Sequence, residues 1–380
     1  MELSQYGSNV ARSLPKSNNM TIRSIILLSL FIIGCSSVPK PHSYTSNPSL
    51  RTIMAIDSRD TLFRGTPIDD DGRFINLEIP FEPDFGDLLK WQLSSNPQKE
   101  EKKSDIWRPY IFTSTDFLHD SRDCIVWLGH ACFFIRLSGV TILTDPVFGD
   151  ILFTTRTSPF PFSPDILRNI DYVFLSHDHR DHCDKESLQL LIRNNPQAKI
   201  IAGLGMNDLI DDWLEDTPHH QAEYAGWYQQ FTTDTTKIKI YFMPSRHWSK
   251  RGLFDTNCRL WGGLTIVSDA TTIYISGDTG YGNHFRDAGK LFPSIDYAIM
   301  GVGAYSPRWF MAANHISPEQ AIQGFHDMKA KHFIPMHYGT FDLSDEPISE
   351  PMRLLRQMEE QSVIHGTLHI PGIGEPIILP

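Results

Sequence analysis

Four side chains that can bind a metal ion lie within six consecutive residues of this chain, namely His177, His179, Asp181 and His182. A regular helix would spread these side chains around its circumference, and a strand would place His182 on the face opposite the other three. Neither arrangement directs all four toward one place. The segment is therefore expected to form a tight loop, which restricts the folds open to the chain.

The residues on either side of this loop indicate an α/β fold. An apolar run at 171–175 is typical of a short buried strand. Asp184 is suitably placed to cap a following helix, whose inner face would carry Leu188, Leu191 and Ile192. A loop that ends a strand and opens a helix is where open α/β sheets place their chemistry.

The residue types indicate which metals bind and how many ions. Imidazole and carboxylate ligands suit zinc, iron or manganese. Three histidines and one aspartate exceed what one catalytic zinc requires, because such an ion keeps a coordination position open for water. We therefore expect two metal ions at this loop. The alternative, a chance group of solvated polar residues, would rarely fall between a buried strand and a capped helix.

Length and charge limit the remaining possibilities. With 380 residues, the chain can bury one large core or two modest ones. Its net charge of −11 argues against a nucleic-acid partner, which would require clustered lysine and arginine. The sequence contains no evident repeat or low-complexity tract.

Residues 1–35 are expected to be a signal peptide with a lipobox. Residues 1–19 are polar, and Met20 is an alternative start. Arg23 then precedes an apolar run at 24–33 that is short for a membrane span. Cys35 follows where this run ends, in the position of the lipidated cysteine of bacterial lipoproteins. An ordinary signal peptide or a short anchor helix is the alternative.

Lipidation of Cys35 would anchor the mature protein in the bacterial cell envelope. Ser36, rather than aspartate, follows the cysteine. The resemblance to lipoprotein sorting signals then implies the outer membrane, with the protein facing the periplasm.

The other cysteines occur singly within apolar or motif segments. An exported protein is able to pair them, but their spacing is not that of a disulfide framework. We expect buried free thiols at Cys124, Cys132, Cys183 and Cys258.

Composition also predicts the domain boundaries. Residues 36–105 are rich in proline, serine, asparagine and aspartate, and are expected to form a tether and an N-terminal strap. Within them, 73–76 and 88–91 are expected to be ordered, whereas 95–104 is expected to be a solvated loop. The main domain would occupy residues 106–380.

Four further segments share one pattern, an apolar strand followed by a side chain that can bind metal or accept hydrogen bonds. Residues 140–143 lead to Asp145, 239–243 to His247, 272–276 to Asp278 and 332–336 to His337. Taken singly, each of these side chains is compatible with a bystander role. Delivered to one edge, the last three would complete a two-metal site with the loop. Asp145 is expected to orient the loop through hydrogen bonds.

The stretch at 148–162 contains several phenylalanines among threonine, serine and proline. This composition fits a loop packed under a helix, and it equally fits an apolar entrance for substrate.

With these motifs the sequence resembles the metallo-β-lactamase superfamily and, within it, N-acylphosphatidylethanolamine-hydrolysing phospholipases D and their bacterial relatives. The similarity spans roughly residues 70–345. The motifs most specific to this group are Tyr-x-Pro-Arg-Trp-Phe-Met at 305–311 and His-Trp-Ser-x-Arg-Gly at 247–252. Broader landmarks begin at Trp127, Leu143, Ser176, Leu260, Gly277, Gly303 and His337.

The resemblance implies an αββα sandwich of two facing mixed sheets, with the metals at one edge. It implies one zinc ion held by His177, His179 and His247, and a second held by Asp181, His182 and His337, with Asp278 bridging both. Iron or manganese would accept the same ligands.

The activity implied is hydrolysis of N-acylphosphatidylethanolamine to phosphatidic acid and N-acylethanolamine, assisted by two metal ions. Asp181 would orient the attacking hydroxide as well as bind metal. His315 would polarise the phosphate or protonate the leaving oxygen. A structural histidine facing the helix cap at Ser317 is the alternative for His315.

Tyr305, Trp309 and Phe160, together with His315, are expected to contact a phospholipid substrate in the membrane. One rival is another hydrolase on this scaffold, acting on lactones, β-lactams or small phosphodiesters. A second is a non-enzymatic lipoprotein that binds lipid or protein and whose metals are structural. The complete ligand set disfavours the second rival, since a structural zinc needs only four ligands. Nothing in the sequence predicts the oligomeric state.

Overall fold

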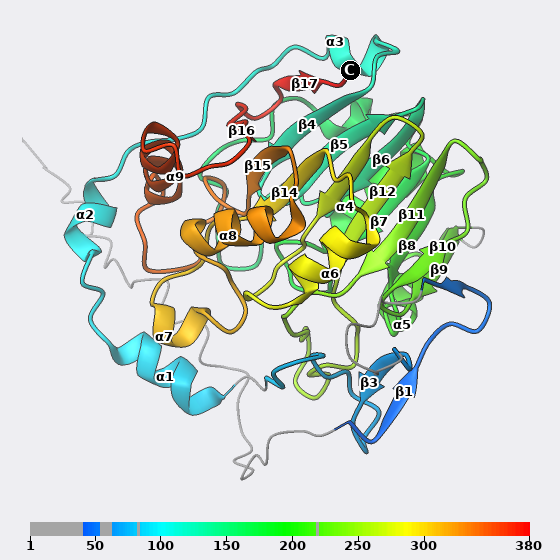
Figure 1. Ribbon diagram of the computed structural model, residues 1–380, viewed down its shortest axis with the longest axis horizontal. Coiled ribbons are helices and arrows are strands. Elements are labelled where there is room, and N and C mark those ends of the chain that lie inside the picture. The colour runs from blue at the N-terminus through cyan, green and yellow to red at the C-terminus, as the bar shows by residue number, and fades with distance from the viewer. Residues whose placement is uncertain (1–40, 54–62, 82–83, 218–219) are drawn as a thin grey trace, which may run out of the picture.

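The computed structural model describes residues 41–53, 63–81, 84–217 and 220–380. Cys35 and the expected signal peptide lie outside the described residues. In the described part, two large β-sheets face each other and carry helices on their outer sides (Figure 1).

The first sheet has seven strands in the order β17-β4-β5-β6-β7-β8-β9. Its central strands β4 to β6 pair antiparallel, and β6 to β9 run parallel to one another. The bounds are β4 (Cys124–Gly129), β5 (Cys132–Leu137), β6 (Val140–Thr144), β7 (Tyr172–Leu175), β8 (Lys199–Gly203), β9 (Gln221–Ala225) and β17 (Pro376–Ile378).

The second sheet has eight strands in the order β16-β15-β14-β13-β12-β11-β10-β2. Strands β10 to β13 pair antiparallel, and β13 to β16 run parallel. The bounds are β2 (Arg51–Thr52), β10 (Gln229–Phe231), β11 (Ile238–Met243), β12 (Gly263–Ser268), β13 (Thr272–Ile275), β14 (Tyr297–Gly301), β15 (His332–Met336) and β16 (Thr367–Leu368).

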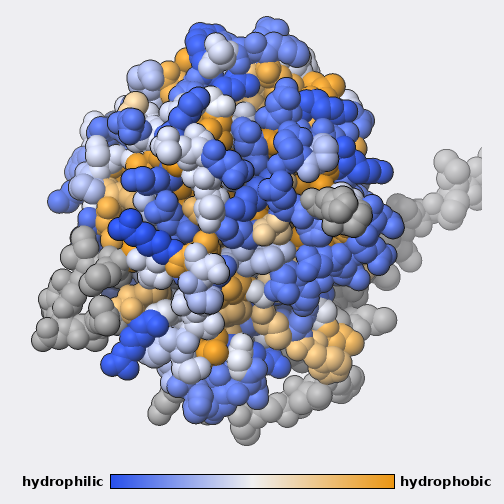
Figure 2. Space-filling view, turned by 90° about the vertical axis from the view of Figure 1, so that its right-hand side faces the viewer, coloured by the Kyte–Doolittle hydropathy of each residue, from blue (hydrophilic) through white to orange (hydrophobic). Residues whose placement is uncertain are grey.

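Helices precede the first sheet, connect its strands or cover the second. They are α1 (Phe85–Leu93), α2 (Lys99–Ser104), α3 (Asp116–His119), η3 (Pro164–Ile166), α4 (Lys185–Asn194), α5 (Asn207–Trp213), α6 (His284–Leu291), α7 (Arg308–Met311), α8 (Pro318–Met328) and α9 (Glu350–Glu360). In the described ranges, none of these helices has both the length and the apolar character needed to cross a bilayer. The face shown in Figure 2 is mostly hydrophilic, with hydrophobic residues in small groups.

Alternation along the strands produces the layers of the core. In β4, Ile125 and Trp127 belong to the core that lies between the sheets, whereas Val126 and Leu128 pack with α4 and α5. Successive strand residues point to opposite faces, so one strand supplies both layers. On the other side, α6 and α8 cover the second sheet (Figure 1). The expected αββα sandwich is therefore confirmed.

Strand direction brings the predicted site residues to one edge of each sheet. Strands β4, β6 and β7 point the same way, and so do β11, β13, β14 and β15. The segments that follow their carboxyl ends contain the predicted ligands. Carboxyl ends of parallel strands are where α/β proteins concentrate their chemistry.

The segment before residue 106 takes part in the fold more than expected. Strand β1 (Ser43–Thr45) pairs with β3 (Thr66–Ile68), and β2 adds to the second sheet beside β10. Helix α1 packs on α7, where the Trp91 and Phe310 rings stack at 5.1 Å. Residues 51–52 of the expected tether thus form an edge strand, and α1 lies over the main domain as a strap.

The prediction of a loop at 95–104 is wrong, because Lys99–Ser104 forms helix α2. Its acidic residues lie in the first turn and two of its three lysines, Lys102 and Lys103, lie in the last turn, which favours a helix through the helix dipole. The expected solvation is correct, since α2 buries none of its residues. Lys102 anchors the helix through contacts with Asp342 and the Ser344 carbonyl.

Three of the four remaining cysteines, Cys124, Cys132 and Cys183, are buried free thiols as expected. Cys258 is also unpaired but exposed, so the prediction of burial is wrong at this position. The reason is local, because Cys258 follows strand β11 in a turn-rich loop rather than in a strand.

Candidate metal centre

The loop after β7 has the compact form expected from its sequence. The His182 and Cys183 amides both donate hydrogen bonds to the His179 carbonyl, at 3.1 and 2.8 Å, which closes the turn. Asp184 then caps α4 by accepting a hydrogen bond from the Ser187 amide at 2.9 Å. The predicted strand, loop and capped helix are confirmed.

Three imidazoles form the first group of candidate ligands. His177 and His179 lie in the loop, and His247 follows strand β11 of the other sheet. Nδ1 of His179 lies 2.9 Å from Nε2 of His177 and 3.2 Å from Nε2 of His247. The three ring nitrogens are close enough to hold one ion together.

Asp181, His182 and His337 form the second group. Asp181 Oδ2 lies 3.5 Å from Nε2 of His182 and 3.4 Å from Nε2 of His337. His337 follows strand β15 with a left-handed backbone, φ +63°. This group also draws its side chains from both sheets.

Asp278 connects the two groups. Its Oδ2 lies 3.2 Å from Nε2 of His182, 3.1 Å from Nε2 of His337 and 3.9 Å from Nε2 of His247. The preceding Gly277 has φ +59°, and a Cβ there would lie 2.6 Å from a backbone oxygen. Glycine is therefore required at the turn that places Asp278.

The donor atoms fit metal ions. Neighbouring ligand atoms lie about 3.3–3.4 Å apart in a tetrahedral site with metal–ligand distances of about 2.0–2.1 Å. The separations among Asp181, His182, His337 and Asp278 are 3.1–3.5 Å. Nε2 of His182 and of His337 are buried, yet neither makes a hydrogen bond to a described residue. This is the geometry of ligands around an ion, and the imidazole and carboxylate set suits zinc, iron or manganese.

In three of the candidate histidines, Nδ1, the ring nitrogen that does not face the other ligands, makes a hydrogen bond. The pairs are His182 Nδ1 with Asp145 Oδ2 at 2.8 Å, His177 Nδ1 with Ser176 Oγ at 2.9 Å, and His247 Nδ1 with the Asn314 carbonyl at 3.2 Å. Asp145 also accepts hydrogen bonds from the Ser176 amide and hydroxyl, each at 2.7 Å. These bonds fix ring orientation and leave Nε2 available to an ion. Asp145 thus makes the contacts that orienting the loop requires.

Burial and charge set protonation in the site. Burial opposes ionisation of Asp278, but His182 and His337 outweigh it and hold the pKa of Asp278 well below its usual range. Burial similarly opposes protonation of His337, yet the neighbouring carboxylates raise the pKa of His337 to about 9. A bound cation would displace that proton, since ligands bind in their deprotonated form.

A buried ion-pair network supports the loop from behind. Asp178 is fully buried and accepts hydrogen bonds from the Lys250 amide and from Nη1 of Arg259, both at 3.0 Å. Nη1 of Arg251 donates to the carbonyls of Asp178 and Cys183, at 2.8 and 2.6 Å. The sequence analysis did not predict the supporting roles of Arg251 and Arg259. The signal available in the sequence was Asp178, an aspartate within the ligand motif.

His315 lies beside the candidate ligands. Its Nδ1 is 3.8 Å from Asp278 Oδ2, and its ring centroid is 5.2 Å from that of His247. Burial lowers the pKa of His315 to about 4. The helix cap at Ser317 is instead completed by Gln320 in a capping box, so His315 faces the candidate ligands rather than the cap.

The other expected substrate contacts lie in different settings. Tyr305 is buried and its hydroxyl donates to Glu350. The Phe160 ring meets the Phe148 ring edge to face at 5.0 Å. It also packs against the outer core, which is the apolar layer between the first sheet and helices α4 and α5. Trp309 is 48% exposed, with Lys90 above its ring at 4.4 Å. Of the three, Trp309 alone offers a large exposed face.

The packed-loop interpretation of residues 148–162 holds for part of the stretch, whereas the apolar entrance for substrate stays a prediction. Phe148, Phe160 and Phe162 pack against the outer core, as in the packed-loop interpretation. Leu152 and Phe153 at the tip are about half exposed. The tip is therefore the part of this loop that a substrate is able to meet.

Sequence reasoning also missed His130, which follows strand β4. Its side chain is buried, and its Nε2 lies 2.9 Å from Asp181 Oδ2. His130 joins Asp181, His182 and His337 in one candidate metal-binding group. The available signal was Gly129-His130-Ala131, which interrupts two apolar runs at 125–128 and 132–137.

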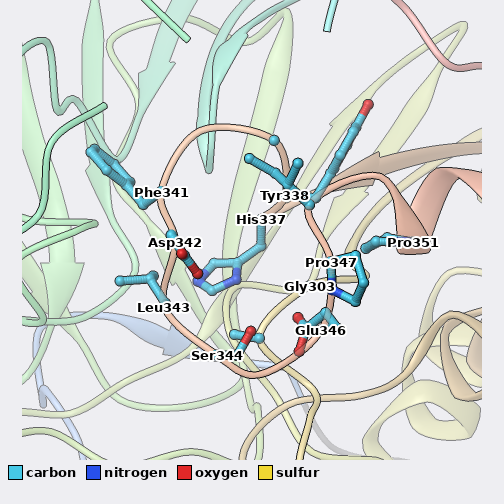
Figure 3. Close-up of a pocket in the computed structure, with 13 residues that line it drawn as sticks. Gly303, His337, Tyr338, Phe341, Asp342, Leu343, Ser344, Glu346, Pro347 and Pro351 are labelled. Carbon is cyan, nitrogen blue, oxygen red and sulfur yellow. The ribbon is translucent and has the colours of Figure 1, made fainter. Parts of the chain in front are cut away.

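A small cavity lies beside His337. The chain from Phe341 to Pro347 curves around the His337 ring (Figure 3). The cavity has a volume of about 30 Å³, enough for a water molecule. Glu346, which lines it, is buried, and burial raises the pKa of this carboxyl group.

Comparisons with known proteins agree with this geometry. A family described as Beta-lactamase superfamily domain matches residues 140–338. The N-acyl-phosphatidylethanolamine-hydrolyzing phospholipase D 1 of Caenorhabditis elegans is 32% identical over 287 residues, covering 71% of this chain and 80% of that protein. A UPF0173 metal-dependent hydrolase of Hyperthermus butylicus is 30% identical over 236 residues, covering 62% of this chain and 90% of that protein.

Among solved structures, the chain is similar to Igni18, a metallo hydrolase from the archaeon Ignicoccus hospitalis. The TM-score is 0.51 at 20% identity, covering 68% of this chain and 98% of that chain. At this identity the likeness supports the fold alone.

Proposed function

Since this chain belongs to the β-lactamase superfamily and is a metal-dependent hydrolase of the metallo-β-lactamase fold, we propose that it is a dinuclear phosphodiesterase of the phospholipase D type. Its substrate is N-acylphosphatidylethanolamine, and its products are phosphatidic acid and N-acylethanolamine. The similarity to the worm phospholipase supports this substrate.

One observation carries the proposal: Asp278 Oδ2 lies between two groups of candidate ligands. His177, His179 and His247 would hold one zinc ion, and Asp181, His182 and His337 the other, with iron or manganese as alternatives. Two such ions, when bound, lower the pKa of a water molecule and neutralise charge on phosphoryl oxygens.

The chain's own residues supply the remaining chemistry. Asp181 orients the attacking water through its carboxylate. His315, beside Asp278 and partly exposed, contacts the phosphate, where it polarises a phosphoryl oxygen or protonates the leaving oxygen. Asp145 keeps His182 in the orientation that this arrangement needs.

Exposed apolar side chains follow three strands of the two sheets, and they support a lipid substrate. They are Leu152 and Phe153 after β6, Leu253 and Phe254 after β11, and Trp309 after β14. These strands end at the metal-bearing edges of the two sheets. Acyl chains drawn from a membrane would therefore meet apolar contacts beside the site.

Replacing Trp309 or Phe254 with alanine should raise the KM for long-chain lipid by roughly tenfold or more, because each exposed ring loses its contact with acyl methylenes. The KM for a short, water-soluble phosphodiester should change little. Steady-state kinetics on both substrates, with metal content measured in parallel, tests this prediction. Phe160→Asp is less suitable, since Phe160 packs against the outer core.

Val363→Ala is the matched control, because Val363 is 42% exposed and precedes β16 at the opposite end of the parallel strands. Equal losses on both substrates would contradict a lipid substrate and would favour a small-molecule phosphodiesterase on the same scaffold.

We also propose that the protein is lipid-anchored through Cys35, in the outer membrane and facing the periplasm. Cys35→Ser should yield a soluble or uncleaved species that lacks lipid, since stable anchoring needs two acyl chains. Fractionation and the mass of the amino-terminal peptide measure this outcome. Cys258→Ser, which removes an exposed thiol, is the control. A Cys35→Ser protein that fractionates with membranes like its parent would show that anchoring lies elsewhere.

A further inference from the structure

His130 occupies a position that the ligand set does not explain. It follows strand β4 with a left-handed backbone, φ +54°, and its side chain is 3% exposed. Residues other than glycine seldom adopt this backbone, and asparagine, aspartate and histidine are the ones that do so most often. Three hydrogen bonds hold it: its amide donates to Thr340 Oγ1 at 2.8 Å, and its carbonyl accepts from Trp127 Nε1 at 2.9 Å and from the His337 amide at 3.1 Å.

These bonds tie His130 to the second ligand group from both sheets. Trp127 lies in β4 of the first sheet, while His337 and Thr340 follow β15 of the second. The left-handed turn and the three bonds fix the backbone of His130, and its buried ring packs against the rings of His337 and Phe341, with centroids at 4.0 and 5.1 Å. Its Nε2 lies 2.9 Å from Asp181 Oδ2.

The oxygen that His130 contacts is also the one that faces the other ligands. Asp181 Oδ2 lies 3.4 Å from His337 Nε2 and 3.5 Å from His182 Nε2. The His130–Asp181 contact is a hydrogen bond, whereas Nε2 of His182 and of His337 make none to a described residue. His130 therefore holds the carboxylate, and the other two histidines are placed as ligands.

We propose that His130 is a positioning residue, whose Nε2–H donates to Asp181 Oδ2 and fixes this carboxylate for the second metal ion. The proposal rests on the dinuclear function proposed above. An ionised carboxylate only accepts hydrogen bonds, so the proton lies on Nε2 of His130. Without this donor, Asp181 would rotate among several orientations, and the ion would lose a preorganised ligand. Loss of such a supporting contact typically weakens metal binding about 10–100-fold.

Two variants separate the hydrogen bond from the backbone requirement. His130→Asn tolerates the left-handed backbone but is too short to reach Asp181. His130→Gln has a longer amide that is able to donate to the carboxylate. Zn²⁺ affinity and stoichiometry of the purified, metal-stripped chain are measured by competition with a chromogenic chelator. Circular dichroism and a thermal melt verify that each variant is folded.

We expect His130→Asn to weaken one of two zinc equivalents about 10–100-fold, with the other unchanged, and His130→Gln to restore most of the affinity. Unchanged affinity for both equivalents in the folded Asn variant would overturn the proposal. A Gln variant as weak as the Asn variant, with an altered visible spectrum after Co²⁺ loading, would instead make His130 a direct ligand. Two tight zinc equivalents without lipid hydrolysis would contradict the proposed substrate and leave the role of His130 standing.

Discussion

Replacing Asp278 with alanine is expected to remove bound metal and turnover together. Its Oδ2 lies within 3.2 Å of Nε2 of His182 and of His337, and 3.9 Å from Nε2 of His247. Losing this oxygen leaves both ligand groups incomplete. Metal content should fall from about two ions per chain to one or fewer, and turnover by at least about a thousandfold. His177→Ala should behave similarly, because it removes one of three imidazoles from the first group.

Elemental analysis and kinetics on the same preparation measure the two losses. Asp278→Asn keeps the shape of the side chain, and serves if the alanine variant does not fold. Asp269→Ala is the control: this exposed aspartate lies in the turn before β13, at the end opposite Asp278. Full turnover in an Asp278 or His177 variant that holds only one ion would end the two-metal hypothesis.

Arg259→Met is expected to destabilise the fold strongly. Arg259 is 7% exposed and pairs with Asp178, Asp255 and Asp208, at 3.0, 2.7 and 3.0 Å. Asp178 is fully buried, and burial raises the pKa of its carboxyl group. Removing one partner of a buried ion pair leaves the other charge buried without a partner, which costs about 3–5 kcal/mol. The midpoint of urea unfolding measures the loss.

A second substitution shows whether the loss of stability comes from an unpaired buried charge or from lost packing. Arg259→Met combined with Asp178→Asn should recover part of the stability, because no charge is then left unpaired. Arg286→Met breaks an exposed pair with Asp327 and should leave the midpoint unchanged. If the single and double variants unfold at the same urea concentration, the unpaired charge is not the cause.

Short-range patterns in the sequence were sufficient to predict the strands, the ligand loop and the capped helices. Continuous apolar runs identify β6, β7, β11, β13 and β15, and Asp184 and Ser317 cap α4 and α8 as predicted. The strand-end positions of His247, Asp278 and His337 were equally evident. These features depend on residues that are close together in the sequence, so their spacing can be read directly from it. The αββα arrangement came from resemblance to a family rather than from these patterns.

Only the tertiary structure decided which oxygen of Asp181 faces His130, and that Asp178 pairs with Arg259 across the domain. It also decided that Phe160 packs into the outer core while Trp309 stays exposed, and that Lys102 of helix α2 pairs with Asp342. Each of these outcomes depends on contacts between segments far apart in the sequence. The local pattern of apolar and polar residues does not predict such contacts. They arise only when the two sheets pack and bring the ends of β4, β7, β11, β13 and β15 together.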